Sequence, residues 1–463
     1  MTPEQRIAEV EEENAALRKR DEERSRELEA LREELAKVKK EIEEWKRGHR
    51  ERGKRRSSRA EGRRAGPGKP RGRKAGHVGA RPAAPSRIDD EVDHGMAATC
   101  SCGGAVVSTG ERESTVVIEI PEIRPQHTRH IAHVGRCERC HKRVVPRLPG
   151  APAAGKSVAA VSFGPNVQAM ALDLRFERDV PLGKISAFLG QWCGISITTG
   201  GLSQMFDRLR RRSAPSYDEL LAAARSSAVV GLDETGHRQD GVPGWMWLLR
   251  TDQVSVFRFE PSRAAWVAES MLGADFKGVV CSDFYGVYTS HDGWTHGYCG
   301  AHTIREAKKI AEITPCAATE EFRDRLIAFY VAGQKAAASG DAAQRKGARI
   351  RLGHLISSTN FVEFPEIVRL QERLDEHKPG VTLFIDRPDV PATNNATERD
   401  IRAHARHRAV TGGTRSTNGS ASQAHWMSIT QTRRKNGLPL RGFVTGLYES
   451  HLHGKSPPSV FAN

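Results

Sequence analysis

The sequence predicts a multidomain α/β protein, and three observations lead to that prediction. At 463 residues the chain is longer than one ordinary domain. Residues 1–48 have a helical period of apolar side chains, whereas residues 227–288 hold short apolar runs of strand length, interrupted by one helical segment. The 72 Lys and Arg exceed the 57 Asp and Glu to give a formal charge of +15, which favours a polyanionic partner, above all nucleic acid.

Two classes of protein are disfavoured by the same sequence. The chain has no run of about 18 apolar residues, and its N-terminus is charged where a signal peptide would be apolar. We therefore expect a cytoplasmic protein without a membrane segment. Eight cysteines in such a chain favour metal binding or buried thiols over a disulfide framework.

Residues 1–48 are predicted to form a coiled coil. With Ile7 at heptad position a, nine of the twelve a and d positions are apolar. The polar Asn14 at an a position is typical of two-stranded coils, where it sets the register. We therefore expect this segment to join subunits into a homo-oligomer. The alternative is a single solvated helix, because Asp21 and Arg24 interrupt the middle of the seam.

Residues 49–90 are predicted to form a disordered basic tether. Gly, Pro and Ser are frequent there, and residues 46–81 carry 15 Lys or Arg against two Glu. Such a segment binds DNA phosphates without reading the base sequence; the alternative is a solvated linker whose charge only aids solubility. The cations expected to contact DNA here are Arg55, Arg56, Arg63, Arg64, Arg71, Arg73 and Lys74.

Residues 91–150 are predicted to form a small zinc-binding module. They contain two cysteine pairs, spaced C-x-C and C-x2-C, at the ends of a stretch that alternates like strands. Four thiolates on two turns suit a closed tetrahedral Zn²⁺ site, which is structural rather than catalytic. Because the first pair is one residue short of the usual spacing, His94 or His141 is an alternative ligand; another interpretation leaves all four cysteines unligated. The predicted ligands are Cys100, Cys102, Cys137 and Cys140.

Residues 155–225 are predicted to be helical, and one part has the outline of a helix-turn-helix. In PLGKISAFLGQWCGISITTGGLSQMFDRLRRR a first helix ends near Gly194, and a second, capped by Thr198 or Thr199, ends in four arginines. A helix-turn-helix would read DNA with its second helix, whereas an ordinary helical hairpin with a basic end has the same pattern. Cys193 is expected to be a core residue rather than a ligand.

Residues 226–420 are predicted to contain a ribonuclease H-like sheet. The segments SAVVGLDET, GWMWLLRT and QVSVFRFEP have the pattern of three strands, AAWVAESML that of a helix, and GVVCSDFYGVY that of a fourth strand. On such a sheet an acid on the first strand lies beside an acid at the end of the fourth. Asp233 and Glu234 point to opposite faces of the first strand, so only one of them can enter the site, and we select Asp233.

Two further carboxylates complete a candidate metal site. Asp283 ends the fourth apolar run, where its carboxylate would meet Asp233, and Glu398 lies on the helix predicted from DVPATNNATERDIRAHARHR. Each has a structural alternative: Asp283 as the cap of the next helix, and Asn395-x-x-Glu398 as a capping box. Three neighbouring acids would repel one another unless divalent cations lay between them, and oxygen ligands suit Mg²⁺.

At these residues the chain resembles the DDE transposases of the insertion sequence 66 family. The motifs that carry the resemblance are LDETG, CSDFYGVY, CGAHTIREAKK and NNATERDIR, which are specific in this order. The resemblance implies that Asp233, Asp283 and Glu398 are a catalytic triad that holds Mg²⁺ or Mn²⁺. It also implies a helical insertion at about residues 310–380, and we expect residues 421–463 to form a C-terminal helical tail.

The resemblance further implies partners and additional site residues. The expected reaction is metal-dependent cleavage and transfer of DNA strands, with the element's ends and a target DNA as partners. Small accessory proteins of the same element are further candidate partners, and a nucleoid-associated location in the cytoplasm is expected. Cys299, which shares a family motif with His302 and Arg305, either shapes the site or packs in the core. The residues expected to contact DNA near the site are His302, Arg305, Arg399, Arg402 and Arg406.

Two other functions fit parts of the sequence. A catalytically inactive DNA-binding protein derived from a transposase would share the coil, the basic tether and the cysteines, but it would not need the acids. A tyrosine recombinase would need an arginine, a histidine and a late tyrosine, for which Arg402, His425 and Tyr448 are candidates at poor spacing.

Overall fold

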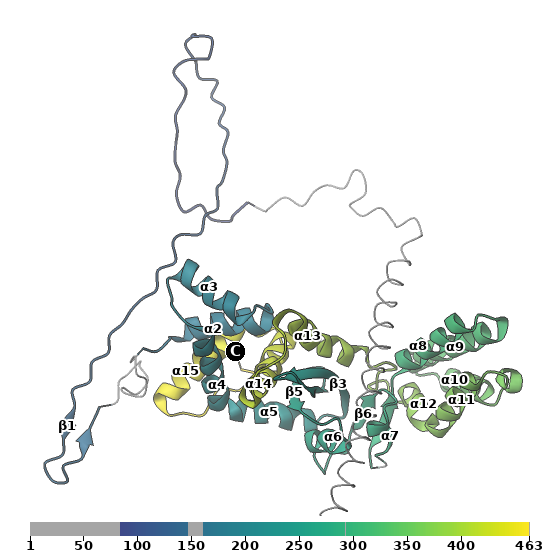
Figure 1. The fold of residues 1–463 in the computed structure, drawn as a ribbon. Coiled ribbons are helices and arrows are strands. Elements are labelled where there is room, and N and C mark those ends of the chain that lie inside the picture. The colour runs from purple at the N-terminus through teal and green to yellow at the C-terminus, as the bar shows by residue number, and fades with distance from the viewer. Residues whose placement is uncertain (1–83, 147–160, 292, 463) are drawn as a thin grey trace, which may run out of the picture. The chain divides into compact units, whose positions relative to one another are not determined.

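The computed structural model describes residues 84–146, 161–291 and 293–462 of a chain that divides into two compact units, Met1–Glu119 and Ile120–Asn463 (Figure 1). The predicted coiled coil and the seven tether cations lie outside the described residues, so they remain predictions. No helix within these three described ranges is long and apolar enough to cross a membrane.

Each predicted cysteine pair lies on a tight turn. In the first unit the amide of Gly103 donates to the carbonyl of Cys100 at 2.8 Å. In the second unit Cys137 and Cys140 lie in the turn between two short antiparallel strands. These strands are β1 (Gly135–Arg136) and β2 (Arg143–Val144). Because the two pairs belong to different units, a zinc site that needs all four cysteines remains a prediction.

The alternating stretch between the cysteine pairs does not form the small sheet that its pattern predicts. Residues 107–134 pair with no strand in the described part of the chain. Their apolar side chains enter no core: Val107 and Val117 are each 83% exposed. Alternation specifies a sheet only where a partner strand or a hydrophobic core covers one face, and this stretch has neither within the described residues.

Within the described residues, five helical segments precede the main sheet of the second unit. They are α2 (Pro165–Leu172), the π-helical η1 (Asp173–Glu177), α3 (Leu182–Cys193), α4 (Thr199–Arg212) and α5 (Ala214–Arg225). Gly194 ends α3 in the left-handed conformation, at φ 61°, which glycine adopts without strain. Thr198 caps α4, since its hydroxyl accepts the Gly201 amide at 3.0 Å. Cys193 is a core residue, as predicted.

Five strands form the central sheet. They are β3 (Val229–Gln239), β4 (Val242–Arg250), β5 (Ser255–Glu260), β6 (Val279–Ser282) and β7 (Thr295–Tyr298). Their spatial order is β5-β4-β3-β6-β7: the first three are antiparallel, and β6 and β7 continue beside β3 as parallel strands (Figure 1). Helix α6 (Ala265–Leu272) lies between β5 and β6 along the chain, which gives the predicted strand and helix order. The short α7 (Gly286–Thr289) follows β6.

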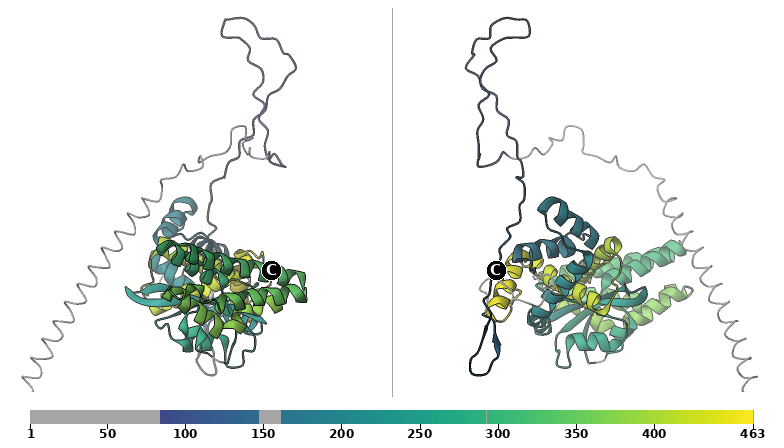
Figure 2. Two further views of the ribbon diagram at one scale, coloured as in Figure 1. Left: turned by 90° about the vertical axis from the view of Figure 1, so that its right-hand side faces the viewer. Right: turned by 60° about the vertical axis from the view of Figure 1, so that its left-hand side comes forward.

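A helical subdomain follows β7. Its segments are α8 (Gly300–Ile313), α9 (Ala317–Ser339), α10 (Ala342–Ile356), η2 (Thr359–Phe361), α11 (Pro365–Glu376) and α12 (Lys378–Asp386). They pack around a second core, which includes Phe322, Phe329, Leu352 and Leu370 and also takes in buried residues of β6 and β7. Helix α12 packs against β7, so the subdomain adjoins the parallel side of the sheet. In the right-hand view of Figure 2 its green helices lie together at one end of the second unit.

The C-terminal helices are part of the core that contains the sheet. They are α13 (Asn395–Thr411), α14 (Thr417–Lys435) and α15 (Leu440–His453). Helix α14 packs against β5, and its fully buried Trp426 donates to the Phe206 carbonyl at 3.0 Å. The predicted boundary between residues 420 and 421 therefore falls inside a buried helix. The sequence concealed this because α14 buries small polar side chains, such as Ser428, whose hydroxyl accepts the Phe257 amide at 2.7 Å.

Candidate active site

Asp233 lies on β3 with its side chain partly buried. Its Oδ1 accepts the amide of Glu234 at 2.9 Å. The pKa of the Asp233 carboxyl is raised to about 7, chiefly by burial, then by the negative charge of Glu234, and further by those of Asp283 and Glu398. Asp283 and Glu398 therefore lie close enough for their charges to act on Asp233, although the three carboxylates do not gather within 4.8 Å of one another in the described residues.

Strand pairing brings the end of β6 beside β3. The two strands run parallel with Gly231 opposite Cys281, and Asp233 and Asp283 each follow two residues after that pair along their own segments. Asp283 lies just beyond β6, and its Oδ1 accepts the amide of Tyr285 at 3.0 Å. Tyr285 itself is the N-cap residue of α7, so the alternative of Asp283 as that cap is not formed.

Glu398 lies in the first turn of α13, and the start of this helix is tied to β3. Asn394 is the N-cap residue, and its side-chain amide donates to the Leu232 carbonyl at 3.1 Å. The helix has no side-chain cap, so the alternative capping box of Asn395 and Glu398 is not formed. The Glu398 carboxylate instead accepts from Arg402 at 3.0 Å.

A glycine near the start of β3 allows α13 to approach. A Cβ atom at Gly231 would overlap the hydroxyl of Thr397, and it would lie 3.0 Å from Asn394 Oδ1. Thr397 is one residue before Glu398, so any side chain at position 231 would push Glu398 away from Asp233. Gly231 therefore sets the distance between the helix and the strand that carry two of the acids.

Positive charge is unevenly distributed around the three acids. Glu398 lies 3.0 Å from Arg402 and 3.5 Å from Arg305. In the part of the chain that the structure describes, neither Asp233 nor Asp283 has an ion-pair partner. The part of the site formed by Asp233 and Asp283 therefore carries negative charge that no ion pair with a described side chain neutralises.

Glu234 points to the opposite face of β3, as strand alternation requires. Its side chain is 3% exposed and accepts two hydrogen bonds from Arg263, at 2.7 and 2.5 Å. The hydroxyl of Tyr288 donates to its other oxygen. Arg263 also stacks over the ring of Tyr285, two residues after Asp283. Glu234 thus ties β3 to the segment that follows Asp283, which is a structural role.

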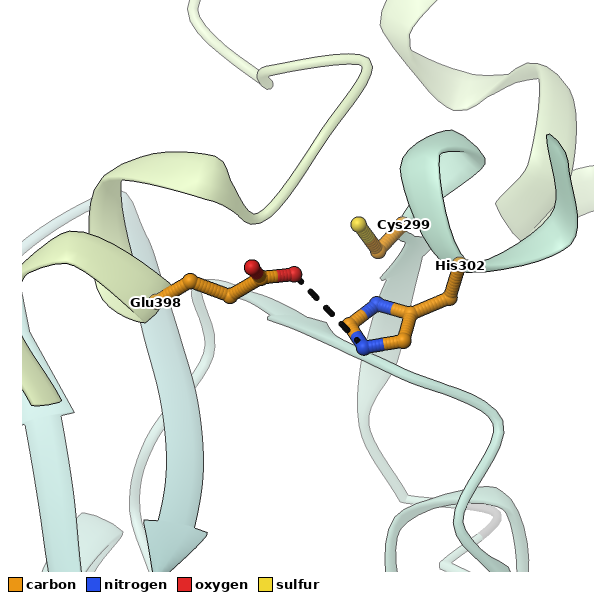
Figure 3. A group of neighbouring side chains, drawn as sticks. All are labelled: Cys299, His302 and Glu398. Carbon is orange, nitrogen blue, oxygen red and sulfur yellow. Dashed lines mark ion pairs between the residues drawn. The ribbon is translucent and has the colours of Figure 1, made fainter. Parts of the chain in front are cut away.

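Cys299 and His302 lie beside Glu398, which faces them from α13 (Figure 3). His302 Nε2 is 3.6 Å from Glu398 Oε1. Cys299 is the N-cap residue of α8, and its Sγ accepts the amide of Asn394 at 3.0 Å. Cys299 is only 2% exposed, so it packs in the core. It also borders the site, because its sulfur lies close to Glu398.

The predicted DNA-contacting arginines have different surroundings. The side chains of Arg402 and Arg305 are 72% and 59% exposed beside Glu398, and Arg399 is exposed on the same helix as Arg402. Arg406 lies farther along α13, where it donates to Asp179 at 2.7 Å. Arg406 therefore helps to hold α13 against the helices that precede the sheet, a contact that sequence reasoning did not foresee.

The residues considered for a tyrosine recombinase have separate neighbours. Arg402 contacts Glu398, whereas His425 is buried in α14 with its Nε2 2.7 Å from the Ser213 hydroxyl. Tyr448 lies on α15, where burial raises the pKa of its hydroxyl and the charge of Arg212 partly offsets this effect. The described contacts therefore bring Arg402 together with neither of the other two residues.

Comparison with known proteins identifies the family. A sequence model described as "Transposase IS66 family" matches residues 160–422, which is more than half of the chain. The chain belongs to this family. It is also similar to "Uncharacterized protein y4jO" of Sinorhizobium fredii (strain NBRC 101917 / NGR234), with 27% identity over 145 residues. That alignment covers 31% of this chain and 44% of the relative, so the chain spans less than half of the relative's length.

In this IS66 family member, sequence reasoning missed the residues that place the acids. Gly231 and Asn394 bring α13 to β3, and Arg263 and Tyr288 bind Glu234. A glycine inside an apolar strand is a signal of close backbone approach, so Gly231 could have been found. The partners of Glu234 lie too far away along the chain for any local pattern to reveal them.

Proposed function

We propose that the chain is a DDE-type transposase that cleaves DNA at the ends of its element and joins those ends to a target. Asp233, Asp283 and Glu398 are its catalytic acids. Membership of the family supports the reaction class. The observation that carries the choice of residues is the convergence of three carboxylates from β3, from the end of β6 and from the first turn of α13.

The topology of the sheet supports a ribonuclease H-like core. Three antiparallel strands are followed by two parallel strands, and β3, which comes first along the chain among the strands of this sheet, lies in the middle. An acid on that strand and an acid at the end of its parallel neighbour are what this scaffold would use. The helical subdomain between β7 and α13 then corresponds to the insertion expected before the third acid.

The donor set fits Mg²⁺ or Mn²⁺ bound by Asp233, Asp283 and Glu398. These residues offer only carboxylate oxygens, which hard cations prefer. The pKa of Asp233, which is raised chiefly by burial and then by neighbouring negative charges, supports the fit, because a nearby cation would favour the charged carboxylate. Divalent cations held there supply Lewis acidity at the scissile phosphate and promote deprotonation of the attacking water or DNA 3′-hydroxyl.

The protein's own residues orient the DNA. Arg402 and Arg305 flank Glu398 with exposed guanidinium groups that suit phosphate oxygens. His302 lies on the same side and offers a further contact to the strand that enters the site. Asn394 and Gly231 hold Glu398 in place before the substrate arrives, which lowers the cost of assembling the site.

Binding of the element's ends is assigned to the N-terminal parts. Helix α4 exposes Thr199, Ser203, Gln204 and Arg208, which are side chains suited to base edges and phosphates in a major groove. The basic tether would add contacts that do not depend on base sequence, and the predicted zinc module would hold its cysteine turns in a fixed shape. A coiled coil between two subunits would keep two ends together, with or without accessory proteins of the element.

A cleavage assay tests the proposal. Full-length protein is incubated with labelled duplexes that carry the inverted repeats flanking its gene, and with scrambled duplexes of equal length. We expect Mg²⁺ or Mn²⁺ to yield breaks with free 3′-hydroxyl groups at the element boundary, and EDTA to prevent them. Specific binding without breaks in either metal would identify an inactive DNA-binding derivative, and breaks with covalently attached protein would exclude the proposed chemistry.

A further inference from the structure

A second group of metal-binding atoms adjoins the carboxylate triad. Cys299, His302 and Glu398 each offer one ligand atom, and these atoms all lie within 4.8 Å of one another (Figure 3). Within the described ranges this is the one group of three such residues that gathers so closely. We propose that these residues bind a thiophilic divalent cation such as Zn²⁺, and that its binding withdraws Glu398 from the triad and inhibits strand cleavage.

Local structure presents the thiol and the imidazole together. Cys299 is the N-cap residue of α8, directly after β7, and His302 follows three residues later, so one helical turn carries both. The amide of Cys299 donates to the Ser282 carbonyl at 2.9 Å, which fixes this turn beside the end of β6. Glu398 reaches the same point from α13, so two helices and a sheet edge hold the three donors.

The Cys299 sulfur is oriented for metal binding. Burial raises the pKa of the Cys299 thiol, and the Asn394 amide, which donates to its Sγ at 3.0 Å, partly offsets this effect. Cys299 is 2% exposed, so its sulfur is shielded from oxidants in solution. On binding, the thiol proton passes to solvent and the sulfur lone pair takes its place on the cation.

The His302 imidazole retains unused donor capacity. Its Nε2 faces Glu398 at 3.6 Å, which is too long for a hydrogen bond, and its buried Nδ1 has no hydrogen-bond partner in the described structure. Around a tetrahedral zinc ion, ligand atoms lie roughly 3.3–3.8 Å apart, given bonds of about 2.0–2.3 Å. A shift of about 1 Å by the partly exposed His302 and Glu398 side chains would therefore close the site.

The chemistry of the donors separates this site from the triad. One sulfur, one nitrogen and one carboxylate oxygen favour Zn²⁺ or Co²⁺, whereas three carboxylates favour Mg²⁺. Glu398 belongs to both sets and cannot serve both in one geometry. Arg402 and Arg305 also pair with Glu398, so they oppose a cation there, and we expect weaker binding than at a four-cysteine zinc site.

Cobalt spectroscopy tests the metal-binding claim without any DNA. Full-length protein is first saturated with one equivalent of Zn²⁺ for the predicted cysteine module and then titrated with Co²⁺. We expect a saturable near-ultraviolet thiolate-to-cobalt band in the wild-type protein, its loss in Cys299→Ser, and weaker binding in His302→Ala. Cys316→Ser is the matched control, because Cys316 is also a helix N-cap but lies outside the group. An undiminished band in Cys299→Ser would overturn the site.

The inhibitory claim rests on the proposed function and has its own test. Zinc is added to cleavage reactions at saturating Mg²⁺, and each protein is compared with its own zinc-free rate. Half-inhibition of Cys299→Ser should need at least about tenfold more Zn²⁺ than the wild type, since loss of even an outer-shell partner costs about ten- to a hundredfold in metal affinity. Equal sensitivity would overturn the inhibition. A protein that never cleaves DNA but shows the cobalt band would disprove the proposed function and leave the metal site intact.

Discussion

Replacing Asp233 with Asn should reduce strand cleavage by roughly 10³-fold or more, because an amide cannot supply the charge that holds a divalent cation. The fold should survive, since the side chain keeps its size and the Glu234 amide can still donate to the amide oxygen of Asn. Rates of cleavage on end-bearing duplexes in Mg²⁺, together with DNA affinity and circular dichroism, measure the effect. Cleavage at the wild-type rate would remove Asp233 from the site.

Glu234→Gln is the matched control, and it should behave in the opposite way. Glu234 is buried against Arg263 and Tyr288 on the other face of β3, so its replacement leaves a cation without its partner. We expect a loss of about 1–3 kcal/mol in the free energy of unfolding, with most of the cleavage rate of the folded fraction retained. Equal loss of cleavage in both variants would mean that the two acids are not separated by face.

The raised pKa of Asp233 should also make the stability of the metal-free protein depend on pH. A carboxyl whose pKa rises from 3.8 to about 7 on folding binds more protons in the folded state than in the unfolded state. The free energy of unfolding of metal-free protein therefore falls as the pH rises from about 4 to about 7. Asp233→Asn removes this loss, so at pH 8 without metal it should melt no lower than the wild type. Mg²⁺ should stabilise the wild type more at pH 8 than at pH 5.

Gly231→Ala should be the second most damaging single change, although position 231 touches neither DNA nor metal. The added Cβ overlaps the Thr397 hydroxyl and lies 3.2 Å from Thr397 Cβ, so the start of α13 must move away from β3. A displacement of this order costs about 10²-fold in rate when it separates catalytic groups. We also expect a loss of about 1–3 kcal/mol in the free energy of unfolding.

A double variant distinguishes this steric effect from a general loss of stability. Removing the obstructing hydroxyl, in Gly231→Ala with Thr397→Ala, should restore part of the cleavage rate. Gly236→Ala on the same strand is the control, because a Cβ there would meet its nearest neighbour, the Arg408 guanidinium, at an ordinary 3.8 Å. If the double variant is no better than Gly231→Ala, then Gly231 does not position Glu398 through Thr397.

The acids on the strands could be predicted because their positions follow from local rules. The period of a strand separates Asp233 from Glu234, and the order of strands and helix along the chain predicts that Asp283 ends a parallel neighbour. Glu398 was harder, because its helix comes after a long insertion and has a capping-box pattern. Its place on a predicted helix after the sheet selected it, and the resemblance to a family then supported that choice.

The rest of the site depends on contacts between distant parts of the chain. Nothing near Cys299 indicates that its sulfur meets the amide of Asn394, and nothing near Arg406 indicates Asp179 as its partner. The buried polar face of α14 misled for a related reason: its Ser and Thr side chains have the pattern of a solvated helix, although they bond to backbone groups inside the core. Composition predicts burial only where the polar groups lack internal partners.

The central claim is that three acids far apart in the sequence hold divalent cations at one place. Crystals of the full-length protein grown with Mn²⁺, and measured at a wavelength where manganese scatters anomalously, test this most directly. We expect an anomalous peak within coordination distance of Asp233, Asp283 and Glu398, and its absence in Asp233→Asn crystals. Manganese bound elsewhere, or a wild-type site without manganese under conditions in which the protein cleaves DNA, would contradict the account.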